Sequence, residues 1–181
     1  MHLGSGKRHI PGWVHVDLAD YPHIDYNHDI RTLPMFADES VSVVYSSHTF
    51  EYFDRVEAAS VLTEWRRIII EGGTLRLAVP DIEALIAVYR EYRSLDMIIG
   101  PLYGRMPVDS NHPDHVLYHR TVYDFASISK ILEENGFEDV RRFDWRQTEH
   151  AACDDFSQAY IPHMDKENGL LISLNVEATK R

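Results

Sequence analysis

Short apolar runs alternate with segments of helical periodicity along most of the chain. The β-branched run 41–47 is typical of a strand that is buried on both faces. Over 55–70, apolar residues recur at the spacing of one helix face, namely Ala58, Val61, Leu62, Trp65 and Ile69. A further strand is predicted over 74–79, and Asp81 is predicted to cap the helix that follows it. This alternation favours a parallel sheet with helices packed against it.

The first two predicted strands, 1–3 and 14–17, lie unusually close together in the sequence. The linker between them holds only about ten residues, whereas a parallel crossover usually takes a dozen or more, commonly with a helix. We therefore expect the first crossover helix to be absent or reduced to about one turn. Residues 18–40 follow as a loop with a short strand near 26–30.

Strand and helix periodicity both fail from residue 94 to about residue 120, where glycines and prolines interrupt the pattern. A segment of this length without regular structure is usually a functional lid or is disordered. Its tyrosines and histidines favour a lid. A helix over 121–135 and strands over 138–145 and 170–179 are predicted to close a single domain, 1–181, with the lid or insertion at 94–120.

The composition argues against several classes of protein. The 181 residues fit one domain that is long enough to bury a substantial core. A net charge of -11 argues against nucleic acid as a main partner, because phosphate binding needs clustered Lys and Arg. No apolar run approaches the roughly 18 residues of a membrane span, no signal-peptide pattern precedes the first strand, and the single cysteine suits a reducing compartment. We therefore expect a soluble, cytoplasmic protein.

Two glycines and a carboxylate mark a candidate nucleoside site. Gly4 and Gly6 follow the first apolar run, and Asp17 ends the second. Glycines allow backbone angles closed to other residues and let a ligand lie against bare main chain. An acidic side chain at the end of the next strand can accept hydrogen bonds from both hydroxyls of a ribose. The pattern favours nucleoside binding, although Gly-Ser-Gly also occurs in ordinary loops.

Further motifs occur in a fixed order along nearly the whole chain. They are LGSG at 3–6, GWVHVD at 12–17, DIRTLP at 29–34, SVSVVYSSH at 40–48, EGGTLRLAVPD at 71–81, GF at 136–137 and SLNVEA at 173–178. In this order and spacing the chain resembles the class I S-adenosylmethionine-dependent methyltransferases, and among them the small methyltransferase type 11-like group.

The resemblance implies a Rossmann-like α/β three-layer sandwich, whose seven-stranded, mostly parallel sheet has an antiparallel last strand. S-adenosyl-L-methionine would lie across the carboxyl ends of the first four strands. The implied cofactor-binding residues are Gly4, Ser5 and Gly6 at the methionine moiety, Asp17 and Leu18 at the ribose, Asp29 and Ile30 at the adenine, and Ser46 and Ser47 near the amino group and sulfonium. Two alternatives stay open, because Asp17 could be a strand-end turn residue and Asp29 a helix or turn cap.

Three departures from the family pattern bear on cofactor affinity. The sequence starts inside the first strand, without the helix that normally precedes it. His2 stands near the place where many members carry an acidic residue, and the short linker leaves no room for the helix that usually backs the glycine turn. We therefore expect weaker cofactor binding or a second subunit over the exposed side, which makes a homodimer a candidate assembly.

His48 is the candidate catalytic residue, because it directly follows the fourth strand and so faces the methyl group in the implied fold. Histidine titrates near neutral pH and could accept a proton from a hydroxyl or amine. The alternative is a loop residue that satisfies backbone groups. Glu51 would either orient His48 or, as we favour, begin the next helix.

The acceptor pocket is expected to involve His115, Tyr118 and His119 from the lid, and Asp81 after the fifth strand, although helix capping explains Asp81 equally well. His112 and His115 have the spacing of metal ligands, but Pro113 precludes a regular helix that would bring them together. We therefore expect no metal.

The sequence supports two functions. The first is a methyltransferase that acts on a small-molecule acceptor, because the acidic composition disfavours RNA or DNA. The second is a shortened relative that keeps the sheet, binds cofactor weakly or not at all, and serves as a binding or partner subunit. A nicotinamide dehydrogenase is disfavoured, since its fingerprint requires another glycine near His9.

Overall fold

The computed structural model describes residues 1–109 and 112–181, and the side chains of all of these except 108, 109 and 112–115. The strands are β1 (His2–Leu3), β2 (His15–Asp17), β3 (Tyr26–Asn27), β4 (Val41–Ser47), β5 (Ile69–Pro80), β6 (Met106–Asp109), β7 (His112–Leu117), β8 (Phe137–Arg142), β9 (Tyr160–Ile161), β10 (Leu170–Leu171) and β11 (Ser173–Lys180). The helices are α1 (Arg55–Ile68), α2 (Ile82–Tyr92), α3 (Asp96–Tyr103) and α4 (Phe125–Glu134), with short 3₁₀ turns η1 (Phe50–Tyr52), η2 (Trp145–Gln147) and η3 (Phe156–Gln158).

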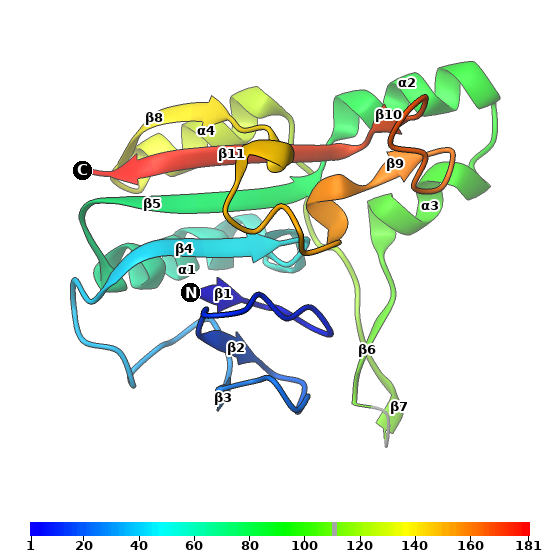
Figure 1. Cartoon of the computed structure of the whole chain (residues 1–181). Helices are drawn as coiled ribbons and strands as arrows, with labels where there is room; N and C mark the ends of the chain where they lie inside the picture. Colours follow the sequence, from blue (N-terminus) through cyan, green and yellow to red (C-terminus); the bar gives the residue numbers. More distant parts are fainter. Residues whose placement is uncertain (110–111) are drawn as a thin grey trace.

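Seven strands form one open sheet in the order β3-β2-β1-β4-β5-β11-β8 (Figure 1). The pairs from β3 to β5 are all parallel, and β11 runs antiparallel to both of its neighbours, β5 and β8. The predicted seven-stranded sheet with an antiparallel last strand is therefore confirmed. The carboxyl ends of the first four parallel strands meet at one edge of this sheet, where open α/β sheets bind ligands.

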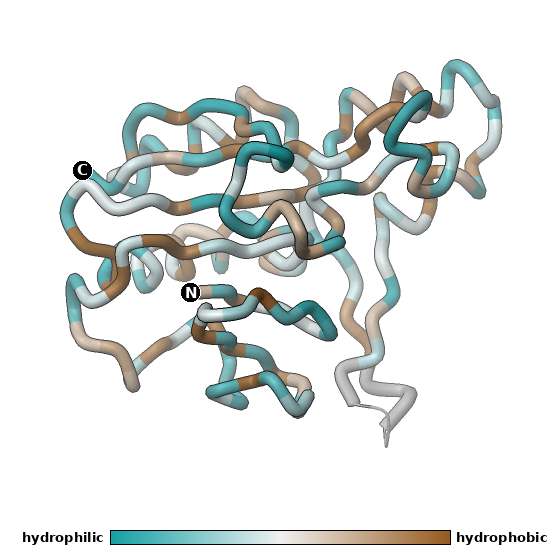
Figure 2. Tube along the Cα trace, viewed as in Figure 1, coloured by the Kyte–Doolittle hydropathy of each residue, from teal (hydrophilic) through white to brown (hydrophobic). Residues whose placement is uncertain are grey.

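One face of the sheet carries the apolar core. Hydrophobic and polar residues alternate along β11 from Ser173 to Thr179, which gives the strand two different faces (Figure 2). On one face, the strand residues pack against α1 and α4 in a continuous cluster that includes Trp65 and Leu132. These two helices lie together behind the sheet in the view of Figure 1.

The opposite face is covered by loops, and a layer of polar rings replaces the usual apolar contact there. His2 and His15 pair in register on β1 and β2, and His2 stacks on Tyr45 of β4 at 5.1 Å between ring centroids. His150, from the segment after η2, stacks on Tyr45 at 4.0 Å. Residues 4–14 contain turns and no helix, so the expected loss of the first crossover helix is confirmed.

The segment 94–120 differs from the expectation of irregular structure. It contains α3 and a hairpin of β6 and β7, which stands on the carboxyl-end side of the sheet (Figure 1). We call residues 94–120 the arm. The sequence concealed these elements because Pro101 lies inside α3 and Pro107 and Pro113 lie in the hairpin strands. A two-stranded hairpin tolerates proline, since each strand has an unpaired edge.

Two further boundaries differ from those predicted. Helix α1 ends at Ile68, and strand β5 begins at Ile69, where the backbone is already extended. Gly72 and Gly73 therefore lie inside the strand. Helix α4 begins at Phe125, because the Asp124 side chain accepts a hydrogen bond from the Ser127 N–H and caps the helix there. In the part of the chain that the structure describes, no helix is both long enough and apolar enough to cross a membrane.

Candidate functional site

The glycine turn after β1 has one filled side and one open side. Gly4 and Gly6 both have positive φ, +66° and +53°, which favours glycine. A Cβ atom at Gly4 would collide with the Thr49 side chain, whereas a Cβ atom at Gly6 would meet nothing within 4 Å. Gly4 is therefore required by the protein's own packing, and the space in front of Gly6 is open to a ligand.

Asp17 joins this turn to the end of β2. Its buried carboxylate accepts a hydrogen bond from the Gly6 N–H at 2.7 Å and another from the Ala19 N–H at 2.7 Å. Asp17 thus acts as a strand-end turn residue, the alternative left open by the sequence. A carboxylate offers about four acceptor positions, so two stay available for ribose hydroxyls.

Buried hydroxyl groups gather at the same edge of the sheet. Ser5 in the glycine turn and Ser46 at the end of β4 are buried, and neither hydroxyl has a hydrogen-bond partner among the described residues. Ser47, the last residue of β4, is also buried. Because buried polar groups are almost always paired in folded proteins, unpaired hydroxyls beside an open glycine turn are suited to a polar ligand.

The predicted adenine contacts are placed differently. The Asp29 carboxylate accepts hydrogen bonds from the backbone N–H and the Nε of Arg31. Burial raises the pKa of Asp29, but the hydrogen bonds from Arg31 outweigh this effect and leave the pKa below its usual value. Asp29 is therefore a turn residue with an ion partner. Ile30 is buried in the core and its carbonyl accepts from Trp65, while Leu18 is exposed.

His48 lies where the sequence places it, directly after β4, but both of its ring nitrogens face protein groups. Nε2 is 3.0 Å from the Ser173 hydroxyl, and Nδ1 is 3.6 Å from Glu51 Oε1. Burial and the neighbouring His119 lower the pKa of His48 to about 3, so the ring is neutral at physiological pH. The backbone at His48 has a positive φ of 49°, a strained conformation for a non-glycine residue.

Glu51 is the residue whose role the sequence analysis did not predict. Helix α1 begins at Arg55 with Asp54 as its N-cap, so the expectation that Glu51 begins this helix is wrong. Glu51 instead points inward from η1 with no exposed surface, and burial raises its pKa to about 8. The His-x-x-Glu spacing of His48 and Glu51 was visible in the sequence, but the burial of Glu51 depends on contacts with the arm.

His119, at the base of the arm, joins this cluster. Its Nε2 lies 3.7 Å from Glu51 Oε1, and its ring packs against Tyr52 and the bare backbone of Gly104. Burial lowers the pKa of His119. The structure thus brings His48, Glu51 and His119 together at the end of β4.

The other predicted pocket residues are placed differently from this cluster. Asp81 caps α2 through hydrogen bonds from the N–H groups of Glu83 and Ala84, as the capping alternative proposed. Tyr118 is half exposed, and the side chain of His115 lies outside the described residues. Among the residues whose side chains are described, no group of three or more His, Cys, Asp or Glu is arranged to hold a metal ion.

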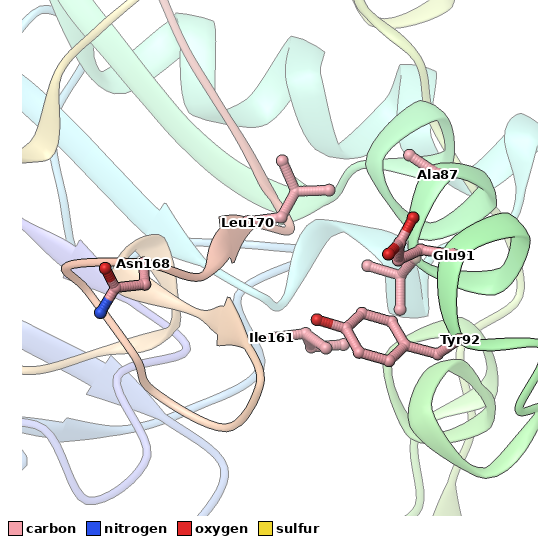
Figure 3. A pocket seen from close by; sticks show the side chains of 7 residues that line it. Ala87, Glu91, Tyr92, Ile161, Asn168 and Leu170 are labelled. Atoms are coloured by element: carbon pink, nitrogen blue, oxygen red, sulfur yellow. The ribbon is translucent and has the colours of Figure 1, made fainter.

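A hollow of about 340 Å³ lies elsewhere, between α2 and the strands β9 and β10 (Figure 3). Its lining includes Val88, Glu91, Tyr92 and Leu170. None of the residues predicted to bind cofactor or acceptor lines it, and its lining carries no cluster of titratable groups. We therefore place the candidate site at the glycine turn and the end of β4, and not in this hollow.

Comparison with known proteins gives a family match and several structures of the same fold. Residues 13–77 match the family model of a methyltransferase domain. A Thermotoga maritima S-adenosylmethionine-dependent methyltransferase superposes with a TM-score of 0.56 at 14% identity, over 99% of this chain and 81% of that chain. The chain therefore has the fold of these methyltransferases.

Two other solved structures show the same fold. A chain from a Haloferax volcanii complex, described as the Trm112 methyltransferase activator with a methyltransferase, has a TM-score of 0.55 at 17% identity, over 99% of this chain and 80% of that chain. A Listeria monocytogenes protein described as an S-adenosylmethionine-dependent methyltransferase has a TM-score of 0.52 at 17% identity, over 93% of this chain and 79% of that chain. A search of curated protein sequences gives no match.

The cofactor of S-adenosylmethionine-dependent methyltransferases fits the residues present at the glycine turn. The open face of Gly6 leaves room for a ligand against the main chain, and Asp17 keeps free acceptor positions beside it. The unpaired hydroxyls of Ser5 and Ser46 could pair with the amino-acid end of the cofactor. The adenine side has fewer available polar groups, because the Asp29 carboxylate is bonded to Arg31 and the Ile30 carbonyl to Trp65.

Proposed function

We propose that this chain binds S-adenosyl-L-methionine at the glycine turn and transfers its methyl group to a small-molecule acceptor. The observation that carries the proposal is the open face of Gly6, held by the Asp17 carboxylate at the carboxyl end of β1. This arrangement leaves bare main chain and a carboxylate side by side, which is what an adenosyl group requires.

The bound cofactor would supply a methyl group that is already activated by the sulfonium. The protein then has to hold the acceptor atom in line with it and exclude water. Gly4, Ser5 and Gly6 would contact the methionine moiety, Asp17 and Leu18 the ribose, and Ser46 and Ser47 the region of the amino group. Asp29 and Ile30 stay our candidates for the adenine side, through their backbone, because their side-chain groups are engaged within the fold.

His48 is our candidate base for an acceptor that carries a proton. Its neutral imidazole lies at the end of β4, which in this fold faces the reacting methyl group. To accept a proton at Nε2, the ring must release its contact with Ser173. His119 at the base of the arm, with His115, Tyr118 and Asp81, would shape the acceptor side.

A small acceptor is supported by the charge of the protein. The net charge of -11 opposes the approach of a polyanionic nucleic acid. We further propose that the chain is one domain in which the arm serves as a lid, and that two copies pair through the exposed edge strand β3.

Screening metabolites for the release of S-adenosylhomocysteine tests the activity. We expect one chemical class of acceptor to release the product in proportion to enzyme, and Asp17→Ala to reduce this release at limiting cofactor concentration. If the protein binds the cofactor but no acceptor gives product, the small-molecule assignment fails.

A partner subunit without catalysis is the second candidate function. The packing of Thr49 against Gly4 favours it, since this contact fills part of the space beside the turn. The Haloferax volcanii structure is a complex between a methyltransferase and its activator, so association with a second protein has a precedent in this fold. Absence of cofactor binding together with formation of a stable heteromeric complex would favour this function.

A further inference from the structure

A carboxyl group without a hydrogen-bond partner is buried at the active-site end of the sheet. Glu51 has no exposed surface, and neither of its carboxyl oxygens has a hydrogen-bond partner among the described residues. One oxygen, Oε1, faces two imidazole nitrogens, at 3.6 Å from His48 Nδ1 and 3.7 Å from His119 Nε2. An ionised carboxylate in this position would carry an uncompensated buried charge, which is costly.

The hydrogen bonds around His48 determine which of its nitrogens carries the proton. Asn175 donates from Nδ2 to the Ser157 carbonyl at 2.8 Å, which turns its Oδ1 toward Ser173. The Ser173 hydroxyl donates to that Oδ1 at 2.9 Å, so its oxygen is left as an acceptor for His48 Nε2 at 3.0 Å. His48 therefore carries its proton on Nε2 and presents a lone pair on Nδ1 to Glu51.

The same logic fixes the tautomer of His119. Its Nδ1 lies 3.0 Å from the Pro101 carbonyl oxygen, which can only accept a hydrogen bond. His119 therefore carries its proton on Nδ1 and presents a lone pair on Nε2 to Glu51. Two imidazole lone pairs thus face one carboxyl oxygen, an arrangement that repels a carboxylate, whereas a carboxylic acid offers its one proton to one of the two nitrogens.

Among the residues whose side chains are described, the remaining groups around Glu51 supply no compensating cation. The hydroxyls of Tyr52 and Tyr123 face the same buried region, and the pKa of each is raised by burial and by the neighbouring Glu51. The positive charge of Arg55 acts to lower the pKa of Tyr123, and Arg120 of the arm pairs with Glu57 at 2.7 Å. Burial raises the pKa of Glu51 to about 8 although a hydrogen bond with its own backbone opposes the rise, and this direction is the one that the tautomers require.

We propose that Glu51 is a neutral carboxylic acid at physiological pH and that its proton sets the tautomer of His48. In the acid form, the Glu51 proton lies on the side of the Nδ1 lone pair, 3.6 Å away, and Nε2 keeps its proton, so His48 cannot act as a base. When Glu51 releases its proton to solvent, the imidazole proton moves to Nδ1, opposite the carboxylate, and Nε2 gains the lone pair. Glu51 is then a positioning residue that acts through His48.

The consequence for catalysis rests on the proposed function. With Glu51 ionised, His48 can accept the acceptor's proton at Nε2, and the resulting imidazolium is paired with the carboxylate. Turnover should therefore rise as the pH passes through the ionisation of Glu51. The arm is linked to the same event, because His119 shares the carboxyl oxygen with His48.

Infrared spectroscopy of the wild-type protein at neutral pH tests the assignment without any substrate. Exposed carboxylates are ionised under these conditions, so the C=O stretching band of a protonated carboxyl would report a buried acid. We expect this band in the wild-type protein and in the surface control Glu134→Gln, and its loss in Glu51→Gln. ¹⁵N NMR should show His48 protonated on Nε2 and His119 on Nδ1. A missing band, or a doubly protonated imidazole at either position, would overturn the proposal.

The pH profile of turnover provides the second readout. We expect wild-type turnover to rise across about pH 8, and Glu51→Gln to turn over slowly with no such rise. An unchanged profile in Glu51→Gln would overturn the role of Glu51, even in a fully folded variant. If the infrared band and the tautomers are as stated but no acceptor is methylated, the proposed function fails while the protonation of Glu51 stands.

Discussion

At the residue scale, Asp17 and Gly6 carry the cofactor hypothesis together. The Asp17 carboxylate holds the Gly6 N–H at 2.7 Å, so the turn and the strand end form one unit before any ligand arrives. Gly4 belongs to the same turn, yet its missing side chain is explained by Thr49. The two glycines of one motif thus meet different requirements.

Asp17→Ala should weaken binding of S-adenosylmethionine by about 1–3 kcal/mol, the cost of leaving buried polar partners unpaired. Calorimetric titration measures this change, with Asp20→Asn as the control, because Asp20 is exposed on the same loop. Equal affinity in Asp17→Ala and the wild-type protein would refute the ribose assignment.

Substitution of the two glycines should separate packing from ligand binding. An alanine at positive φ costs roughly 1–2 kcal/mol, which applies to both Gly4→Ala and Gly6→Ala. Only Gly4→Ala adds a collision with Thr49, so it should lower the unfolding free energy more. Gly6→Ala should weaken cofactor binding well beyond its effect on stability. Urea unfolding and calorimetric titration measure the two effects. A larger loss of stability in Gly6→Ala, together with a larger loss of cofactor affinity in Gly4→Ala, would contradict the open face of Gly6 as the site.

At the element scale, local patterns in the sequence predict the main sheet and helices well. The spacing of Ala58, Val61 and Trp65 identifies α1, because its buried stripe belongs to one continuous core. The arm was missed because proline interrupts its periodicity, and because a two-stranded hairpin lies outside the main sheet and needs no buried stripe.

The candidate site was only partly predictable for a related reason. Gly6, Asp17 and His48 lie next to strand ends, and strand ends follow from the hydrophobic pattern. The character of Glu51 depends on His119, which comes from a distant part of the chain and reaches η1 only after the arm has folded back. The turn role of Asp29 depends on Arg31, two residues away, and was left open as a capping alternative.

Asp81 provides a test at this scale, since helix capping and acceptor binding predict different results. Asp81→Ala should lower the unfolding free energy by about 1 kcal/mol, the usual cost of removing an N-cap. Asp81→Ser should restore most of this stability, because serine also caps helices. Turnover that stays normal in Asp81→Ser would remove Asp81 from the acceptor pocket, whereas a loss of turnover in the stable serine variant would place it there.

At the scale of the whole molecule, the two faces of the sheet respond differently to pH. The helix-covered face is built on a continuous apolar core. On the other face, burial and the neighbouring histidines lower the pKa of His2 well below its usual value, and burial also lowers the pKa of His15 and His150. These rings are stable in the fold only while they are neutral.

Stability should therefore decline on acidification. The unfolded chain takes up protons on histidine from about pH 6.5 downward, whereas His2, His15 and His150 in the folded protein take them up only at lower pH. The contribution of these three rings to the unfolding free energy is therefore fully present above about pH 6.5 and falls as the pH drops below it. Thermal unfolding from neutral to mildly acidic pH measures the decline. His2→Phe keeps the stack on Tyr45 and should flatten this decline, whereas His163→Gln, at an exposed position, should not. A steep decline in His2→Phe equal to that of the wild-type protein would argue against the buried ring layer as its cause.

We propose that the turn around Gly6 and Asp17 binds an adenosyl cofactor. Calorimetric titration of the wild-type protein with S-adenosylmethionine and S-adenosylhomocysteine is the decisive test of this binding. We expect both ligands to bind saturably with dissociation constants below millimolar, and Asp17→Ala to weaken their binding. A folded protein that releases no heat with either ligand up to millimolar concentration would contradict it.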